Sequence, residues 1–444
     1  MAPDGPRPSA GTAVRRRHQR AWYVYDWANS AFQTSVITVF LGPYLTELAR
    51  AAADAQGFVR PLGLPLRAAA FYPYLVSLSA LLQVMAMPLI GALADRTGRR
   101  RLLLGVLAYT GAIGTMLLYF VRGDAYLLGG LLFLVTSVAF TCAVVVYNAW
   151  LPDIAVTAER DAVSSRGWAL GYLGGGLLLA ANLVLLRLAD PLGIDLADAV
   201  RISIVSAGGW WALFTVVPLL GLRDPPPRSA GGSGFGQLAD TLRGLRRAPA
   251  TLTFLAAYLL FNDGVQTVIS QAAIFADQEL RLAQDVIVIA VLAVQLVAVV
   301  GALLLGRLAD RFGAKRVVLA SLLVWIGVLA YAYALPAGRV QPFYALACLI
   351  GLVLGGTQAL SRSLFSHMVP TGREAEYFSA YEISDRGTSW FGALLFGLAV
   401  QLTGSYRIAI VSLVVFFAAG FVLLWLADIR RAAAEAGNAA PARV

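Results

Sequence analysis

The sequence predicts an all-α integral membrane protein with twelve transmembrane helices in two pseudo-symmetric six-helix bundles. Three observations predict this class: an apolar composition, the length of the apolar runs and a repeated loop. Of the 444 residues, 59% are hydrophobic and 14% are charged, whereas about a quarter of the residues of a soluble protein are charged. The apolar residues form runs of about twenty, the length at which a helix crosses roughly 30 Å of hydrocarbon.

Twelve such runs follow one another along the chain, and each is predicted to form one transmembrane helix. The first and the eleventh runs are the least hydrophobic. The approximate limits are 22–45, 68–90, 102–121, 125–150, 165–187, 201–221, 251–275, 286–306, 317–335, 341–365, 377–402 and 406–428.

The distribution of Lys and Arg predicts the orientation of these helices. If the N-terminus is cytoplasmic, 26 of the 35 Lys and Arg residues fall on the cytoplasmic side and 9 on the outer side. Cytoplasmic loops of membrane proteins carry such an excess. The preference for Arg over Lys is typical of a GC-rich bacterial genome. We therefore expect a multi-pass protein of the bacterial plasma membrane with both termini cytoplasmic, and the net charge of +10 does not indicate a nucleic-acid partner.

A stretch rich in Pro, Gly and Ser divides the helices six and six. Its second part, 235–247, is basic and amphipathic, which predicts a short helix at the membrane surface. The expected organisation is a basic cytoplasmic tail over 1–21, a first bundle over 22–222, a linker over 223–250, a second bundle over 251–429 and a cytoplasmic tail over 430–444.

One loop is written twice, as GALADRTGRRRLLL (91–104) and GRLADRFGAKRVVL (306–319). The copies follow the second helix of each predicted bundle, which indicates a duplicated unit. Glycine permits tight turns and close helix approach, and an aspartate there can accept from Arg or lie at a helix N-terminus. The alternative is a loop that only sets topology. The motif residues are Gly91, Asp95, Arg96, Gly98, Arg99, Gly306, Asp310, Arg311 and Gly313.

Polar residues inside the predicted helices are candidates for a substrate or proton pathway, because a charged side chain within the bilayer is energetically costly and usually has a function. The first helix carries a stripe of Asp26, Asn29 and Gln33, and the seventh carries Asn262, Asp263 and Gln266. Asp26 lies near the cytoplasmic end, where a structural role is the alternative. Asp263 lies roughly 18 Å into its helix, which makes it a candidate proton carrier. Gln358 of the tenth helix is a further candidate substrate contact.

The eleventh helix carries three charges in its cytoplasmic half, Glu382, Asp385 and Arg386. Their spacing predicts either a gate whose ion pairs exchange or a neutralised group that fixes this helix, in one arrangement against Asp95. Two other helices carry glycines at four-residue spacing, Gly167, Gly171 and Gly175 in the fifth and Gly351 and Gly355 in the tenth. Such faces favour close helix packing.

Other classes of protein are disfavoured. The two histidines, His18 and His367, lie at the predicted cytoplasmic surface, and no nucleophile–base pairing, metal cluster or phosphate-binding loop is visible. We therefore expect neither an enzyme nor an ATP-driven pump, and no cofactor or metal.

The loop GxLaDrxGrr resembles the signature of the major facilitator superfamily. YDWANSAF (25–32), FNDGVQT (261–267), GGTQALSRSLFSHMVP (355–370) and YEISDRGTS (381–389) resemble the branch that includes the yeast vacuolar amino-acid effluxer linked to autophagy. This resemblance covers nearly the whole chain. It implies a twelve-helix transporter and, through that branch, amino-acid efflux.

Together these observations predict a monomeric secondary active transporter that moves a small polar organic solute by alternating access. Amino-acid efflux is the leading expectation, with protons as the candidate coupling ion and the lipid bilayer as the surrounding partner. The alternative is a multidrug or lipid-like amphiphile exporter of the same fold, which would use the aromatic residues of the first and seventh helices.

Overall fold

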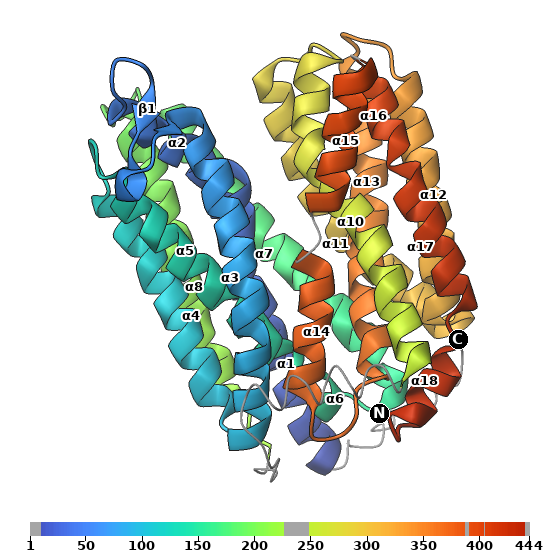
Figure 1. Ribbon diagram of the computed structural model, residues 1–444. Helices are drawn as coiled ribbons and strands as arrows, with labels where there is room; N and C mark the ends of the chain where they lie inside the picture. Colours follow the sequence, from blue (N-terminus) through green and yellow to red (C-terminus); the bar gives the residue numbers. More distant parts are fainter. Residues whose placement is uncertain (1–9, 226–247, 387–389, 404, 440–444) are drawn as a thin grey trace, which may run out of the picture.

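A computed structural model describes residues 10–225, 248–386, 390–403 and 405–439. Two groups of long helices stand side by side, an N-terminal half and a C-terminal half (Figure 1). The described chain starts and finishes at the same end of the molecule, which we call the terminal end. The opposite end, where α2 and β1 lie, is the far end.

The N-terminal half consists of α1 to α8 with short connecting elements. These are α1 (Ala10–Ala31), the π-helix η1 (Phe32–Phe40), α2 (Leu41–Ala51), β1 (Phe58–Val59), the 3-10 helix η2 (Pro61–Gly63), β2 (Leu66–Arg67), α3 (Ala68–Thr97), α4 (Arg100–Leu117), the 3-10 helix η3 (Leu118–Phe120), α5 (Tyr126–Asn148), α6 (Leu151–Ile154), the 3-10 helix η4 (Thr157–Glu159), α7 (Arg160–Leu188) and α8 (Leu196–Gly221).

The C-terminal half consists of α10 to α17, and a short helix follows it. These are α10 (Pro249–Gln278), α11 (Gln284–Phe312), α12 (Ala314–Ala334), α13 (Val340–Ser366), α14 (Glu374–Arg386), α15 (Trp390–Thr403), α16 (Tyr406–Ser412), α17 (Val414–Leu426) and α18 (Ile429–Glu435).

Ten helices among the described residues are long and apolar enough to cross a membrane. The first and the eleventh predicted runs are not among them. The first is divided among α1, η1 and α2, and α1 includes the basic segment 15–20. The eleventh is divided between α14 and α15, which have 13 and 14 residues. The all-α membrane fold is confirmed, with the antiparallel pair β1–β2 as a small addition.

Two predicted boundaries shift in the structure. Helix α1 begins at Ala10, so the described part of the predicted tail over 1–21 is helical. Helix α18 begins at the last residue of the predicted second bundle and continues into the predicted tail over 430–444, with Ile429, Ala432 and Ala433 buried. The predicted surface helix over 235–247 lies outside the described residues.

Glycines set the distance between packed helices, as their spacing predicted. An added Cβ at Gly171 of α7 would lie 2.7 Å from the Ser30 hydroxyl oxygen of α1. An added Cβ at Gly351 of α13 would lie 2.7 Å from the Val294 carbonyl oxygen of α11. Both helix pairs therefore depend on positions without a side chain.

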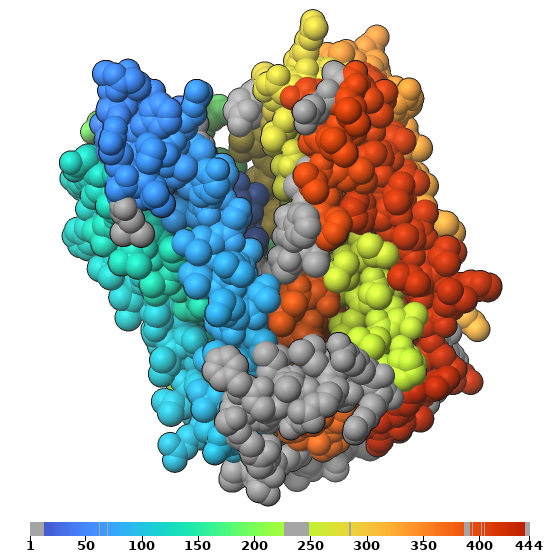
Figure 2. All heavy atoms as spheres, in the orientation of Figure 1, coloured from blue at the N-terminus to red at the C-terminus, as the bar shows by residue number. Residues whose placement is uncertain are grey.

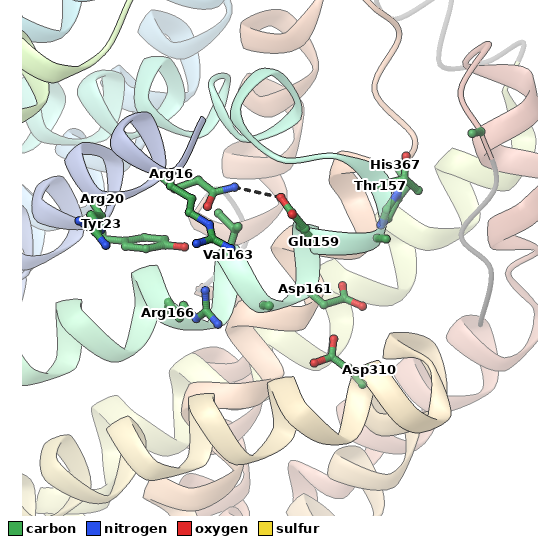
Figure 3. Close-up of a pocket in the computed structure, with 15 residues that line it drawn as sticks. Arg16, Arg20, Tyr23, Thr157, Glu159, Asp161, Val163, Arg166, Asp310 and His367 are labelled. Carbon is green, nitrogen blue, oxygen red and sulfur yellow. Dashed lines mark hydrogen bonds between the residues drawn. The ribbon is translucent and has the colours of Figure 1, made fainter. Parts of the chain in front are cut away.

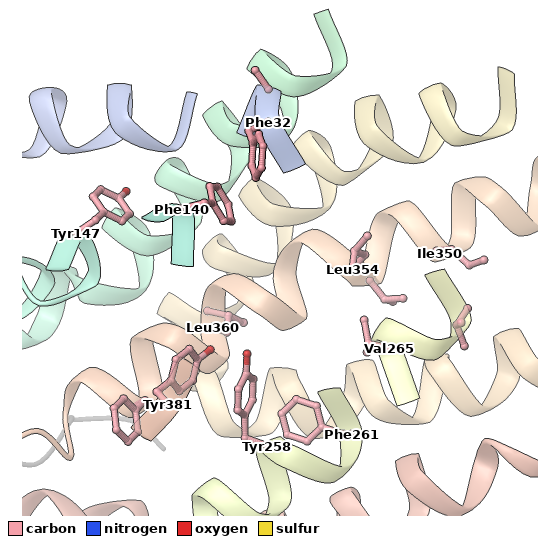
Figure 4. Close-up of a cluster of buried hydrophobic side chains, with 14 of the residues drawn as sticks. Phe32, Phe140, Tyr147, Tyr258, Phe261, Val265, Ile350, Leu354, Leu360 and Tyr381 are labelled. Carbon is pink, nitrogen blue, oxygen red and sulfur yellow. The ribbon is translucent and has the colours of Figure 1, made fainter. Parts of the chain in front are cut away.

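Aromatic rings fill the core of each half (Figure 4). In the N-terminal half, the rings of Phe32 and Phe140 lie 5.2 Å apart. In the C-terminal half, Tyr258 and Tyr381 stack with centroids 4.3 Å apart, which ties α10 to α14.

The two halves meet unequally along their length. Helix α3 contacts α14, and α7 contacts α11 and α13. Figure 2 shows a hollow between the halves at the far end, whereas the halves approach each other toward the terminal end. The fold is therefore closed at one end and open at the other.

Candidate functional site

The first copy of the repeated loop joins the two halves at the terminal end. Asp95, at the end of α3, is buried and accepts hydrogen bonds from the backbone N–H groups of Ala375 (3.1 Å) and Glu376 (2.9 Å). These are the first-turn donors of α14, which a carboxylate stabilises. Gly91 permits this approach, because an added Cβ would lie 2.6 Å from the Ala375 carbonyl oxygen.

A buried arginine completes this junction. Arg100, the first residue of α4, is 1% exposed and pairs with Asp95 at 2.8 Å and with Glu374 at 2.7 Å. It also pairs with Asp153 at 2.8 Å. One guanidinium thus faces three carboxylates from both halves, so removing Arg100 would leave buried carboxylates uncompensated. The predicted motif residues Arg96 and Arg99 are exposed instead.

The second copy of the loop makes a different junction, against α7. An added Cβ at Gly306 would lie 2.5 Å from the Ser165 hydroxyl oxygen. Asp310 and Arg311 are exposed, in contrast to the buried Asp95. Both loop glycines, Gly98 (φ 64°) and Gly313 (φ 90°), adopt left-handed conformations, so both turns need glycine.

A cavity of about 900 Å³ lies at the terminal end beside this second junction. Charged residues of both signs line it, including Arg16, Arg20, Glu159, Arg166 and Asp310 (Figure 3). His367 lies at its edge, and burial together with the nearby Arg160 lowers the pKa of His367 to about 3. The imidazole is therefore neutral near pH 7, and its Nδ1 lies 3.4 Å from an Arg160 nitrogen.

A second ion pair crosses between the halves deeper in the protein. Arg362 of α13 is 3% exposed, and its Nη2 lies 3.2 Å from Asp26 Oδ2 of α1. The same guanidinium donates to the Ser164 hydroxyl (2.9 Å) and carbonyl (3.0 Å) oxygens of α7. It also donates to Asn148 Oδ1 at 3.3 Å. Arg362 thus binds three helices of the opposite half.

Aromatic rings surround this guanidinium. Its carbon lies 4.7 Å from the Trp22 ring centroid, 5.3 Å from that of Trp168 and 5.9 Å from that of Tyr147. Trp22 and Tyr147 stack with centroids 4.5 Å apart, and the Trp22 indole donates to the Tyr147 carbonyl at 3.0 Å. We call Asp26, Trp22, Tyr147 and Trp168 the aromatic cage. All four belong to the N-terminal half.

The charges of α14 divide between two networks. Asn148 donates to Glu382 at 2.8 Å, which extends the Arg362 network to α14. Asp385 instead accepts from Asn262 (2.7 Å) and Tyr258 (2.9 Å) of α10. The side chain of Arg386 lies outside the described part of the chain, so the predicted group of three charges is described only for its two acids.

Asn262 and Gln358 belong to the second of these networks. Gln358 of α13 donates to Asn262 Oδ1 at 2.7 Å, and both side chains are buried. The network therefore ties α10, α13 and α14 together within the C-terminal half.

Asp263 lies beside this network but does not join it. Its side chain is 1% exposed, and neither carboxylate oxygen accepts a hydrogen bond of good geometry from the described residues. The backbone N–H of Gly392 in α15 is a polar neighbour. The Thr267 hydroxyl, one turn along α10, also has no hydrogen-bond partner among the described residues. A buried carboxyl without a partner is either protonated or awaits a cation.

The remaining predicted residues do not gather at one place. In α1 and η1, Asn29 is buried and Gln33 is exposed. In α10, Gln266 is half-buried. Burial therefore varies along each of the predicted stripes of the first and seventh helices.

Several residues at these junctions were not singled out from the sequence. Arg362 lies inside the predicted run 341–365, so the rule that made Asp263 a candidate applies equally to it. Arg100 lies in a run of three arginines, and only the fold distinguishes the buried one. Trp168, Ser164, Glu374 and Arg160 have no signal beyond their residue types, whereas Trp22 is one of the first-helix aromatic residues that the exporter alternative would use.

The comparisons with known proteins agree with this architecture. The model of the family described as "Vacuole effluxer Atg22 like" matches residues 14–437. The chain is 29% identical to the MFS-type transporter YxiO of Bacillus subtilis (strain 168), over 92% of this chain and 94% of that protein. It is 26% identical to autophagy-related protein 22-1 of Penicillium rubens, over 98% of this chain and 92% of that protein.

A crystal structure of the transporter FucP in the outward conformation has the same fold. Its TM-score is 0.72 at 12% identity, and the match covers 93% of this chain and 98% of FucP. The prediction that the chain is a transporter rather than an enzyme is confirmed by these relatives. The chain belongs to the Atg22-like family of major facilitator superfamily transporters.

Proposed function

We propose that this protein is a secondary active transporter that exports a small polar organic solute, an amino acid, by alternating access. The observation that carries the proposal is the set of charged contacts that, among the described residues, joins the two halves at or near the terminal end. Arg100 and Arg362 both bind residues of the opposite half at or near the terminal end. Arg160 of α7 also donates to the Ser366 carbonyl oxygen of α13 at 2.8 Å.

These contacts suit a reversible closure. Ion pairs and hydrogen bonds across an interface can separate when the two halves rock as rigid bodies, and transporters of this architecture use such a motion. In the structure the far end is hollowed (Figure 2). The excess of Lys and Arg favours a cytoplasmic terminal end, so we interpret this as an outward-open state in the plasma membrane of a bacterium.

The chemistry of the interface favours a polar solute over an amphiphile. A zwitterion needs one anionic and one cationic partner, and Asp26 and Arg362 place one charge of each sign within the interface, where they pair with each other while the terminal end is closed. The buried amides of Asn262 and Gln358 add neutral hydrogen-bonding groups. The family description as a vacuole effluxer supports export as the direction.

Asp263 is our candidate for the coupling group. It is buried near the middle of α10, and no described residue neutralises it. A carboxyl group in such surroundings exchanges a proton more readily than one held in an ion pair. We propose that one chain, which holds both halves and both acids, acts as a monomer.

Transport by the purified protein in liposomes tests the proposal. A panel of amino acids is supplied with and without a pH gradient, and protein-free liposomes measure leakage. We expect gradient-dependent movement of at least one amino acid. Movement of amphiphilic dyes, with no amino acid transported, would replace the proposal with the exporter alternative.

A further inference from the structure

Arg362 occupies a cage that its own half of the molecule does not build. Its guanidinium lies among the rings of Trp22, Tyr147 and Trp168, and it pairs with Asp26. These groups come from α1, α5 and α7, whereas Arg362 comes from α13. A cation is therefore held by the N-terminal half only while the halves are closed at the terminal end.

We propose that the aromatic cage is the binding site for an ammonium group of the transported solute, and that Arg362 is a tethered cation that competes for it. This inference rests on the proposed function, because it assumes that the halves separate at the terminal end. Separation withdraws Arg362 with α13. The cage then presents a carboxylate and three aromatic rings with no cation bound.

The chemistry of the emptied cage selects its ligand. Aromatic faces attract cations electrostatically, tryptophan most strongly, and the attraction grows when water is excluded. Trp22 and Tyr147 are fully buried in the closed state and Trp168 is half-buried. Asp26 adds a full negative charge. A primary or substituted ammonium group satisfies both features, whereas an anion or a neutral amide satisfies neither.

The size of the cage is limited by a glycine. An added Cβ at Gly167 would lie 2.5 Å from Asp26 Oδ2 and 3.0 Å from Arg362 Nη2. The guanidinium thus fills the space that this glycine leaves. A ligand that replaces it must present a cationic group of similar size at the end of its structure.

Competition between the ammonium group and Arg362 for the aromatic cage couples binding of the solute to opening and closure of the terminal end. A bound ammonium group favours the open terminal end, because Arg362 cannot then enter the cage. Entry of Arg362 favours closure and lowers the affinity for the ammonium group. The two ligands of one site therefore stabilise opposite conformations, which is the differential binding that a conformational change requires.

Binding to the purified full-length protein in detergent tests the competition. The probe is leucinamide, which carries an ammonium group and no carboxylate, and N-acetyl-leucinamide is the matched probe without the charge. Isothermal titration calorimetry compares the unsubstituted protein with Arg362→Gln and Arg362→Lys. We expect Arg362→Gln to bind leucinamide about tenfold more tightly, the scale of a desolvated cation–aromatic contact. Arg362→Lys retains a tethered cation and should show little of that gain.

Each of the following results would overturn the inference. An equal gain in Arg362→Gln and Arg362→Lys would mean that loosening the closed end, rather than vacating the cage, raises the affinity. An equal gain for N-acetyl-leucinamide would mean that charge is not recognised. If Arg362→Gln fails to fold, Trp168→Leu with Arg362 retained is used, and it should lose leucinamide binding in a protein that remains folded. Retained binding there would also overturn the inference.

Failure of the proposed transport function can be distinguished from failure of the proposed cage. Amino-acid transport in liposomes, together with unchanged leucinamide binding in Arg362→Gln, would overturn the cage and leave the transporter standing. Leucinamide binding that depends on the cage, with no flux of any amino acid, would support the cage and overturn the proposed transport.

Discussion

At the scale of single residues, Asp26 and Asp263 are the acids that lie deepest in the first helix of each half, and their surroundings differ. Asp26 is paired to Arg362, whereas Asp263 accepts no hydrogen bond of good geometry from the described residues. Removing one partner of a buried ion pair destabilises the fold, whereas an unpaired buried carboxyl costs free energy when it is ionised. The two acids should therefore respond oppositely to the same substitution.

Asp263→Asn is expected to abolish gradient-driven transport without lowering stability. The amide has nearly the same size, and it removes a buried group that ionises at a cost, but it cannot exchange a proton near pH 7. The midpoint temperature of thermal unfolding in detergent should be unchanged or slightly higher. A pH jump should no longer drive solute movement in liposomes.

Asp26→Asn is the matched control. It leaves Arg362 without its carboxylate, so the free energy of unfolding should fall by roughly 3–5 kcal/mol. If Asp263→Asn is destabilised to this extent and the protein still concentrates solute, Asp263 has a structural role and is not the coupling group.

The repeated aspartates give a second prediction. Asp95→Asn should slow transport about tenfold or more, because Asp95 accepts from two N–H groups of α14 and pairs with Arg100, and charged hydrogen bonds are worth roughly 1.5–3 kcal/mol. Asp310→Asn should have a smaller effect, because Asp310 is exposed. The measurement is the initial transport rate of each variant at matched protein amounts in liposomes. Near-normal rates in both variants would mean that the repeated loop only sets the topology.

The residues show how far sequence reasoning reaches. The type and position of Asp95 predicted an anion at a helix N-terminus or beside an Arg, and the structure contains both contacts. An arrangement of the eleventh predicted helix against Asp95 was one of the alternatives, but contact through the first-turn N–H groups of α14, 279 positions after Asp95, could not be predicted. Glu382 and Asp385 lie in one helix at helical spacing, but one faces α5 and the other α10. Only tertiary packing separates them.

At the scale of elements, apolar length predicts most helices and fails where a helix is divided. The first and eleventh runs were the least hydrophobic, and these are the two that no single long apolar helix represents in the structure. The π-helix η1 has no sequence signal in apolar periodicity, although such segments often lie at functional sites. Glycine spacing was more informative, because it identified the α7 and α13 faces that meet α1 and α11.

Glycine packing gives a third prediction. Gly351→Ala should lower the free energy of unfolding by about 1–3 kcal/mol, because the new methyl would lie 2.7 Å from the Val294 carbonyl oxygen and α13 would have to move from α11.

Gly327→Ala in α12 is the control, since nothing lies within 4 Å of its added Cβ. It should leave the stability unchanged or raise it by up to about 1 kcal/mol through helix propensity. Thermal unfolding of both variants in one detergent is the measurement, and equal losses would show that this helix pair does not depend on the glycine.

At the scale of the whole molecule, the symmetry of the two halves explains why the loop occurs twice. The first copy packs on α14, the helical segment that opens the fifth span of the C-terminal half, and the second packs on α7, the fifth span of the N-terminal half. Each half thus contacts the equivalent helix of the other. The first junction is buried and charged and the second is more exposed, so the interface is symmetric in position but unequal in chemistry.

The last prediction concerns which side of the membrane the closed end faces. Introduced cysteines at Ala434 of α18, at the terminal end, and at Ala55, between α2 and β1 at the far end, are exposed and replace the same residue type. Native Cys348 is exposed and is replaced by serine, whereas Cys142 is buried. In intact cells a membrane-impermeant maleimide should label Ala55→Cys, and it should label Ala434→Cys only after permeabilisation. Labelling in the reverse pattern would place the hollow on the cytoplasmic side. The structure would then be an inward-open state, Arg100 and Arg362 would close the outer end, and the charge distribution would violate the positive-inside rule.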